Sequence, residues 1–200
     1  MLSDVMEDYI KAIYVLQSEQ DPPVSTSAIA EYLNKTSPSV TDMLGKLEDR
    51  ELVEREPYRG AELTADGEAV ALEIVRHHRL LEAFLAERLD YDWSEVHDEA
   101  DALEHHISEA FERRVAESLG DPAVDPHGDP IPGADLEPVD EGTGARLADR
   151  EEGDRVVVSR VSDRDEDELA YLADAGITPA TEIAVADVAP FRMVTVTTPT

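Results

Sequence analysis

The first part of the chain alternates apolar and polar positions with the period of amphipathic helices. In residues 3–18 one stripe is apolar, Ser3 is a suitable N-cap, and Asp21-Pro22-Pro23 ends the helix. The apolar stripe consists of Val5, Tyr9, Ile10, Ile13 and Leu16. A second, shorter helix is predicted over residues 26–33.

The next segment predicts a third helix followed by a hairpin. Ser37 at the N-cap and Pro38 at the first helical position mark the start of a helix that runs to about Glu51. Residues 52–56 and 61–64 then flank Tyr58-Arg59-Gly60, which is typical of two short strands joined by a turn.

This element order is that of a winged helix-turn-helix: a helix, a short helix, a tight turn, a further helix and a hairpin. In such domains the start of the second helix of the pair contacts base edges or phosphates. The residues that we expect to contact DNA are Ser37, Pro38, Ser39, Thr41, Asp42, Lys46, Arg50, Arg55 and Arg59. A small helical packing module is the alternative, but the hairpin directly after the helices favours DNA binding.

The rest of the chain predicts further helices, a linker and a small β-rich tail. Two amphipathic helices are expected over residues 66–89 and 95–119, the second capped by Ser94 and closed by Gly120. The following stretch is rich in proline and glycine, as linkers are. Strands are expected at 155–161, 182–188 and 193–197, with a short helix over 166–175.

The pattern therefore predicts a mainly α protein with small β parts. A winged helix-turn-helix head occupies residues 1–64 and a helical dimerisation domain residues 65–120, since two amphipathic helices after such a head suit a dimer interface. A linker spans residues 121–148, and a small SH3-like β-barrel spans residues 149–200.

Composition changes this picture mainly through charge. The 200 residues carry 47 acidic and 17 basic side chains, a formal charge of −30, and acids exceed bases in each predicted domain. An even acidic coat with only three lysines resembles the proteins of salt-in halophiles, in which ions screen the self-repulsion; an acidic mesophilic protein is the alternative. Net charge alone disfavours nucleic acid as a partner, but the winged helix-turn-helix pattern outweighs this argument. We therefore expect salt to weaken DNA binding less than usual, or to promote it.

The same composition excludes several classes of protein. No cysteine is present, which excludes disulfide scaffolds, thiolate metal sites and cysteine nucleophiles. No apolar run approaches the roughly 20 residues that span a bilayer, and no secretory leader opens the chain. We expect a cytoplasmic protein without a membrane partner.

Imidazoles and carboxylates gather on the two predicted long helices. Asp101, Glu104 and His105 have the spacing of one helical face, and His97 lies one turn earlier. His78 and Glu82 stand four residues apart on the preceding helix. Such donors can hold a divalent first-row metal, although acids in so acidic a chain usually form a solvated face. We assign no role to His77 or His127.

Four motifs resemble the metal-dependent repressors of the DtxR/MntR family. They are MEDYIKAIY at 6–14, RHHRLLEAFL at 76–85, HDEADALEHH at 97–106 and the linker PHGDPIP at 126–132. The resemblance covers the whole chain and is closest to the type with a FeoA-like, SH3-like tail. It implies a cytoplasmic homodimer that binds double-stranded operator DNA and represses metal-uptake genes when metal is bound.

The resemblance also implies two metal sites. The primary, regulatory site maps onto Asp8, Asp101, Glu104 and His105, where the cation joins the head to the dimerisation domain. The ancillary site maps onto His78, Glu82, His97, Asp165 and Glu168. The iron-sensing branch has sulfur ligands in place of Asp8 and Asp101, and the manganese-sensing branch has Glu in place of Lys11.

The expected cofactor is therefore Mn²⁺ or Fe²⁺, with Mn²⁺ favoured at the primary site because its ligands lack sulfur. Two alternatives remain open. One is a winged-helix regulator that responds to a small organic ligand, which a metal titration of DNA binding distinguishes. The other is a di-metal carboxylate enzyme or metal store, but that design needs its ligand motif twice and this chain does not repeat it. We expect no enzymatic activity.

Overall fold

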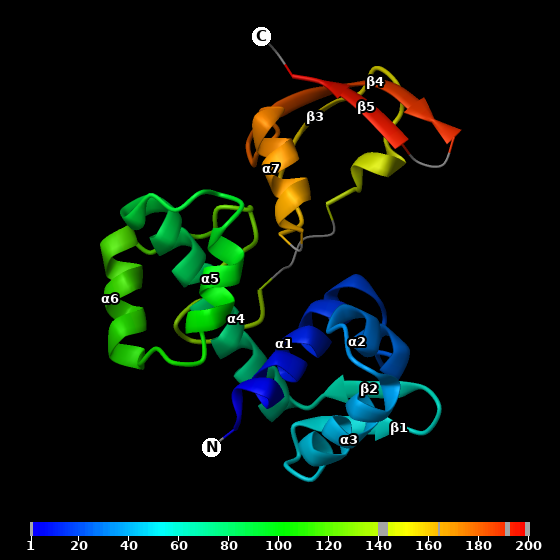
Figure 1. The fold of residues 1–200 in the computed structure, drawn as a ribbon, viewed down its shortest axis with the longest axis vertical. Helices are drawn as coiled ribbons and strands as arrows, with labels where there is room; N and C mark the ends of the chain where they lie inside the picture. The colour runs from blue at the N-terminus through cyan, green and yellow to red at the C-terminus, as the bar shows by residue number, and fades with distance from the viewer. Residues whose placement is uncertain (1, 140–143, 164, 191–192, 199–200) are drawn as a thin grey trace. The chain divides into compact units, whose positions relative to one another are not determined.

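The computed structural model describes residues 2–139, 144–163, 165–190 and 193–198 (Figure 1). The chain divides into two compact units. The first unit comprises residues 1–77, 104–107 and 132–139, and the second comprises residues 78–103, 108–131 and 140–200. The fold is mainly helical with two small sheets, as the sequence predicts. Among the described residues, no helix combines the length and the apolar character that crossing a membrane requires.

Three helices and a hairpin build the head, which Figure 1 shows grouped together. Helix α1 spans Asp4–Glu19, α2 spans Thr26–Tyr32 and α3 spans Ser37–Glu48. Ser3 caps α1 by accepting from the amide of Met6, as predicted. Thr36 rather than Ser37 caps α3, because the Thr36 side chain accepts from the amide of Ser39. The prediction of the α3 N-cap is therefore wrong by one residue.

The hairpin of the head forms the predicted wing. Strands β1 (Val53–Glu56) and β2 (Gly60–Leu63) pair antiparallel. Val24 extends the ladder through two hydrogen bonds with Ala61, at 2.8 and 2.9 Å. Gly60 has φ +140°, and a Cβ there would lie 1.9 Å from the carbonyl oxygen of Val24. The close approach of the Val24 segment to β2 therefore requires glycine at position 60.

The head packs around one apolar core. The α1 stripe contributes Tyr9, Ile10 and Ile13, each at most 2% exposed. Completely or almost completely buried side chains from the other elements join them: Val24, Ile29, Val40, Leu44, Leu47, Val53 and Ala61. Because α1 and α3 share this core, the position of α1 fixes the position of the predicted recognition helix α3.

The helical region departs from the sequence prediction at one point. Helix α4 spans Ala65–Leu89, close to expectation, but the helix predicted over 95–119 is two helices, α5 (Val96–Leu103) and α6 (Glu109–Leu119). Ser108 starts the second by accepting from the amide of Phe111, and Gly120 ends it with φ +78°. Glu104 and His105 therefore lie in a turn and not on a helical face. Ser94 does not cap α5, because its amide and hydroxyl both donate to Asp92.

The tail forms a three-stranded antiparallel sheet in the order β3-β4-β5, with β3 at Arg155–Val157, β4 at Glu182–Ala189 and β5 at Met193–Thr197. A short 3₁₀ helix, η1, spans Leu147–Asp149 and α7 spans Glu166–Asp174. Leu169 of α7 is completely buried, and Ile183 and Val185 of β4 are 2% exposed, so the small core lies between α7 and the sheet. Strand β3 ends at Val157, before the predicted end at 161, and Val161 donates its amide to the carbonyl of His127 at 2.9 Å.

Candidate metal centres

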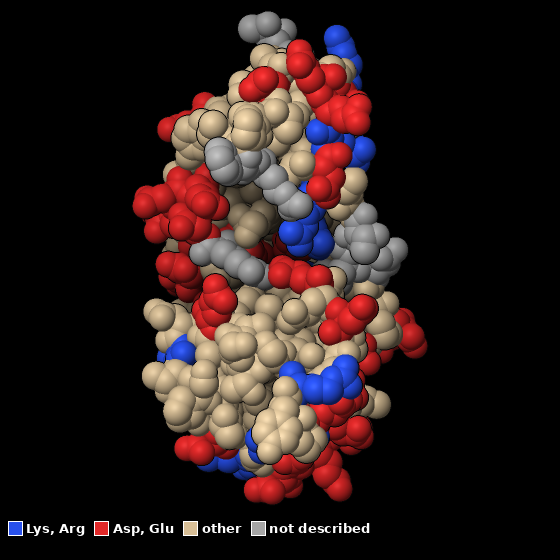
Figure 2. All heavy atoms as spheres, turned by 90° about the vertical axis from the view of Figure 1, so that its right-hand side faces the viewer, with Lys and Arg blue, Asp and Glu red and all other residues tan. Residues whose placement is uncertain are grey.

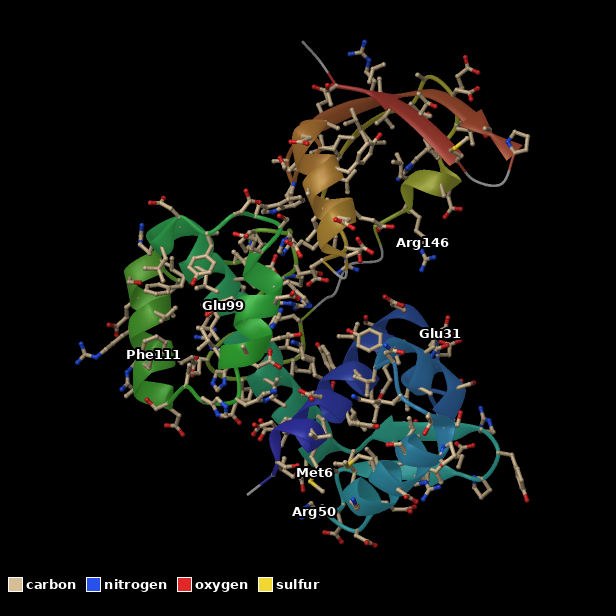
Figure 3. The ribbon with its side chains drawn as sticks, in the orientation of Figure 1. Met6, Glu31, Arg50, Glu99, Phe111 and Arg146 are labelled. Carbon is tan, nitrogen blue, oxygen red and sulfur yellow. The ribbon has the colours of Figure 1, made fainter. Side chains whose placement is uncertain are left out.

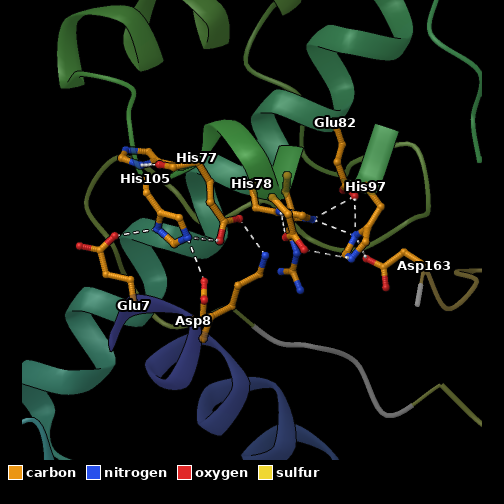
Figure 4. A network of polar contacts seen from close by, with 12 residues as sticks. Glu7, Asp8, His77, His78, Glu82, His97, His105 and Asp163 are labelled. Atoms are coloured by element: carbon orange, nitrogen blue, oxygen red, sulfur yellow. Dashed lines mark hydrogen bonds and ion pairs between the residues drawn. The ribbon is translucent and has the colours of Figure 1, made fainter. Parts of the chain in front are cut away.

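The first cluster of potential metal ligands lies in the first unit, between α1 and the turn at residues 104–107 (Figure 4). His105 Nε2 lies 2.9 Å from Asp8 Oδ1 and 3.5 Å from Glu104 Oε1. His105 Nδ1 lies 2.8 Å from Glu7 Oε2. Lys11 Nζ donates to Glu104 Oε2 at 2.8 Å. One ring nitrogen of His105 thus faces two predicted ligand carboxylates, and the other faces a third acid.

Burial gives this cluster unusual electrostatics. The Glu104 side chain is 1% exposed, and that of His105 is 8% exposed. Burial by itself lowers the pKa of His105, but hydrogen bonding to Glu7 and the charges of Glu104 and Asp8 outweigh it and raise that pKa. The neighbouring carboxylates therefore favour the protonated form of His105, and a bound cation competes with that proton.

The second cluster lies in the second unit, where α4 and α5 contribute His78, Glu82 and His97 (Figure 4). His78 Nε2 is 3.0 Å from Glu82 Oε1 and 3.1 Å from His97 Nδ1, and His97 Nδ1 is 3.2 Å from the same Glu82 oxygen. The two predicted histidines and the predicted glutamate are thus brought together.

The second cluster favours the charged forms of Glu82 and His97. Burial opposes ionisation of Glu82, which is 0% exposed, but the charge of His78 and hydrogen bonds from three histidines set its pKa well below the usual range. Burial also opposes the charged form of His97, but hydrogen bonds to Asp163 and Glu82 raise its pKa to about 9. The Glu82 Oε2 atom is buried and accepts no hydrogen bond from the described residues.

The tail contributes a different carboxylate from the two that the resemblance suggests. Asp163 Oδ2 lies 3.3 Å from His97 Nδ1. Asp165 instead caps α7 by accepting from the amide of Glu168, and both of these side chains are exposed. The local capping role of Asp165 explains the difference, and Asp163 is the tail carboxylate that lies beside the second cluster.

Asp101, which the family resemblance assigns to the first site, belongs to the second unit. Its carboxylate lies 3.2 Å from His78 Nδ1 and 3.7 Å from His97 Nε2. The break in the predicted helix after Leu103 removes the single face on which Asp101, Glu104 and His105 were expected.

The linker holds two residues that sequence reasoning missed. His127, expected to have no role, is completely buried; its Nε2 donates to the carbonyl of Trp93 and its Nδ1 is 3.6 Å from Glu82 Oε1. Asp125 is 5% exposed, and burial together with the charges of Glu82 and Asp129 raises its pKa to about 7. Glu82, Asp125 and His127 offer a further set of donors that shares Glu82 with the second cluster. Their sequence signal, PHGDP, indicates only a turn.

The donor atoms in each cluster suit a divalent first-row cation. Within each cluster they lie within 4.8 Å of one another and combine imidazole nitrogen with carboxylate oxygen. A cation would satisfy the buried Glu82 Oε2, which accepts no hydrogen bond from the described residues. The residues present therefore fit a bound metal.

All nine predicted DNA contacts are exposed on α3, directly after it, or on the wing, and Figure 3 shows Arg50 near the end of α3. Two of the arginines contact carboxylates of the head. Arg55 lies 3.5 Å from Glu48, and Arg59 contacts Glu56. Acidic side chains are also spread widely over the face drawn in Figure 2. Phosphate must therefore compete with carboxylates of the head for these arginines.

Comparisons with known proteins identify three domains along the chain. Residues 1–61 match the iron dependent repressor N-terminal DNA binding domain, residues 64–133 its metal binding and dimerisation domain, and residues 145–198 the FeoA domain. The chain is 35% identical over 196 residues to the diphtheria toxin repressor of Corynebacterium efficiens, which covers 92% of this chain and 84% of the relative. It is 34% identical over 195 residues to the iron-dependent repressor IdeR of Mycobacterium tuberculosis, with the same coverage.

A solved manganese-dependent transcriptional repressor in complex with manganese has a similar fold, with a TM-score of 0.87 and 38% identity over 96% of this chain and 88% of that one. The winged head and the imidazole–carboxylate clusters define a DNA-binding regulator that responds to metal. The chain belongs to the DtxR/MntR family of metal-dependent transcriptional repressors.

Proposed function

We propose that this chain is a homodimeric repressor of metal-uptake genes, activated by Mn²⁺ or Fe²⁺ at the cluster of Asp8, Glu104 and His105. The observation that carries the proposal is the position of this cluster. Asp8 lies on α1 of the DNA-binding head, while Glu104 and His105 come from a segment that matches the metal binding and dimerisation domain. These donors lie within 4.8 Å of one another.

The mechanism follows from what these side chains do with and without a cation. A bound divalent cation supplies two positive charges and directed bonds to oxygen and nitrogen donors. Without the cation, Asp8 lies 2.9 Å and Glu104 3.5 Å from the same ring nitrogen of His105, and these contacts hold the two acids more weakly. Because α1 shares its core with α3, a fixed Asp8 also fixes the recognition helix. In a dimer, two fixed recognition helices can match major grooves about 34–36 Å apart.

The donor set supports Mn²⁺ more than a metal that prefers sulfur. Two carboxylates and one imidazole form a hard site, and the chain contains no cysteine. Solved relatives include a manganese-dependent repressor with bound manganese, and curated relatives include iron-dependent repressors. The second cluster, His78, Glu82, His97 and Asp163, is the proposed ancillary site.

The test compares Asp8→Ala with Asp21→Ala, an exposed acid in the same unit. DNA duplexes are first selected from a random library by the wild-type protein with Mn²⁺ at high KCl, and binding is then followed by fluorescence anisotropy with Mn²⁺, Fe²⁺, Zn²⁺ or a chelator. We expect Asp8→Ala to lose metal-dependent binding while it still elutes as a dimer, and Asp21→Ala to behave as wild type. Metal-dependent binding by Asp8→Ala at wild-type affinity contradicts the proposal, and binding that ignores metal altogether favours the organic-ligand regulator.

A further inference from the structure

The two ring nitrogens of His105 have different neighbours, and this difference assigns a role to an acid that is not in the ligand set. We propose that Glu7 is a positioning residue of the first metal site. It accepts the Nδ1–H of His105 and thereby presents the Nε2 lone pair to the metal. This inference rests on the proposed function of that site and goes beyond it.

The geometry places the ring between two consecutive residues of α1. Glu7 Oε2 lies 2.8 Å from Nδ1, and Asp8 Oδ1 lies 2.9 Å from Nε2. Consecutive side chains of a helix point about 100° apart, so Glu7 and Asp8 can hold the ring from two sides. The ring is 8% exposed, and the Glu7 side chain is 24% exposed. Glu7 is thus less exposed than a solvated surface acid.

Hydrogen bonding at one ring nitrogen decides what the other can do. A neutral imidazole carries one proton, and only the nitrogen without it can bind a metal. A carboxylate that accepts from Nδ1–H selects the tautomer with a free Nε2 lone pair, fixes the ring plane and makes Nε2 more basic. Nε2 is the nitrogen that faces Asp8 and Glu104. Glu7 therefore favours ligation through the correct atom.

Nothing in the sequence around Glu7 distinguishes it from the other acids of α1. Asp4, for comparison, is exposed and lies 3.8 Å from His106, which is also exposed. The selective feature is the contact between Glu7 and a buried ring that comes from a segment 98 residues further along the chain.

The experiment compares Glu7→Ala and Glu7→Gln with Glu31→Ala, an exposed acid of α2 (Figure 3). Mn²⁺ affinity of the full-length protein is measured at high KCl from the electron paramagnetic resonance signal of free Mn²⁺. The tautomer of His105 is read in the Zn²⁺-loaded protein by ¹⁵N–¹H long-range correlation. Asp8→Ala is measured in parallel.

We expect Glu7→Ala to weaken Mn²⁺ binding at one site by about 10–100-fold and to give a mixture of His105 tautomers. The Gln oxygen of Glu7→Gln still accepts from Nδ1–H, so this variant should keep the wild-type tautomer and recover most of the affinity. Glu31→Ala should match wild type.

Two results overturn the inference. Wild-type affinity and tautomer in Glu7→Ala show that Glu7 is only a surface acid. Equal loss of the site in Glu7→Ala, Glu7→Gln and Asp8→Ala shows that Glu7 is a ligand and not a positioning residue. Failure of the proposed function is distinguishable, because Asp8→Ala then retains Mn²⁺ binding whatever Glu7 does.

Discussion

Replacing Lys11 by methionine tests the electrostatics of the first cluster. Lys11 Nζ lies 2.8 Å from Glu104 Oε2, and the two side chains are 14% and 1% exposed. Methionine keeps most of the apolar stem and removes the ammonium group. Loss of one partner of a buried ion pair costs about 3–5 kcal/mol. We expect about 3 kcal/mol, the low end, because Lys11 is partly exposed and His105 Nε2 lies 3.5 Å from the other Glu104 oxygen.

Metal should recover part of this loss, because a divalent cation at Asp8, Glu104 and His105 supplies the missing positive charge. A ligand that binds only the folded state at 100 times its Kd adds about 2.7 kcal/mol. Urea unfolding at high KCl, with chelator and with Mn²⁺, measures both effects. Lys35→Met is the matched control, since Lys35 is exposed and carries the same charge. The reasoning is refuted if Lys11→Met with chelator is no less stable than Lys35→Met, or if Mn²⁺ stabilises the two variants equally.

Three further predictions concern other parts of the chain. The double variant Glu48→Gln/Glu56→Gln releases the wing arginines from their carboxylate partners. The slope of log DNA affinity against log KCl concentration should then steepen by roughly 1–2, as measured by fluorescence anisotropy. Because the pKa of Asp125 is raised to about 7, ionising this carboxyl lowers the stability of the folded state as pH rises from about 4 to about 7. Urea unfolding across that window should show the free energy of unfolding of Asp125→Asn rising relative to that of wild type. Gly128 has φ +93°, and a Cβ there would lie 2.2 Å from a tail carbonyl, whereas Gly153 has φ +94° and no such contact. Gly128→Ala should therefore destabilise the chain by about 1–3 kcal/mol more than Gly153→Ala. Equal losses of stability in thermal unfolding would show that the linker–tail contact is not tight.

Elements with local signals could be predicted closely from the sequence. The predicted helix at 66–89 is Ala65–Leu89, and the predicted strand at 182–188 is Glu182–Ala189. Apolar period and capping residues determine such elements within a few residues of chain. The break between α5 and α6 was missed although Ser108 is a good N-cap, because the apolar pattern continues through it.

The candidate sites could be predicted only in part, for a related reason. His78 and Glu82 share a helical face, and their spacing indicates a pair. The partners that complete the clusters come from distant segments: Asp163 reaches His97, and His127 reaches Glu82. No periodicity relates these positions. Asp165 and Asp163 are chemically identical in the sequence, and only the path of the chain shows that one caps a helix while the other contacts an imidazole.

In so acidic a chain, burial distinguishes Glu82 and Glu104 from the acids of the surface. Exposed acids interact with one another and with cations through water, and salt screens those interactions within about 10 Å or less. Glu82 and Glu104 are 0% and 2% exposed, and each contacts imidazole nitrogen. Screening acts far less on such buried groups, and imidazole favours transition metals over K⁺ or Mg²⁺. High ionic strength should therefore suppress weak cation binding across the acidic surface and leave cation binding at the buried acids largely unchanged.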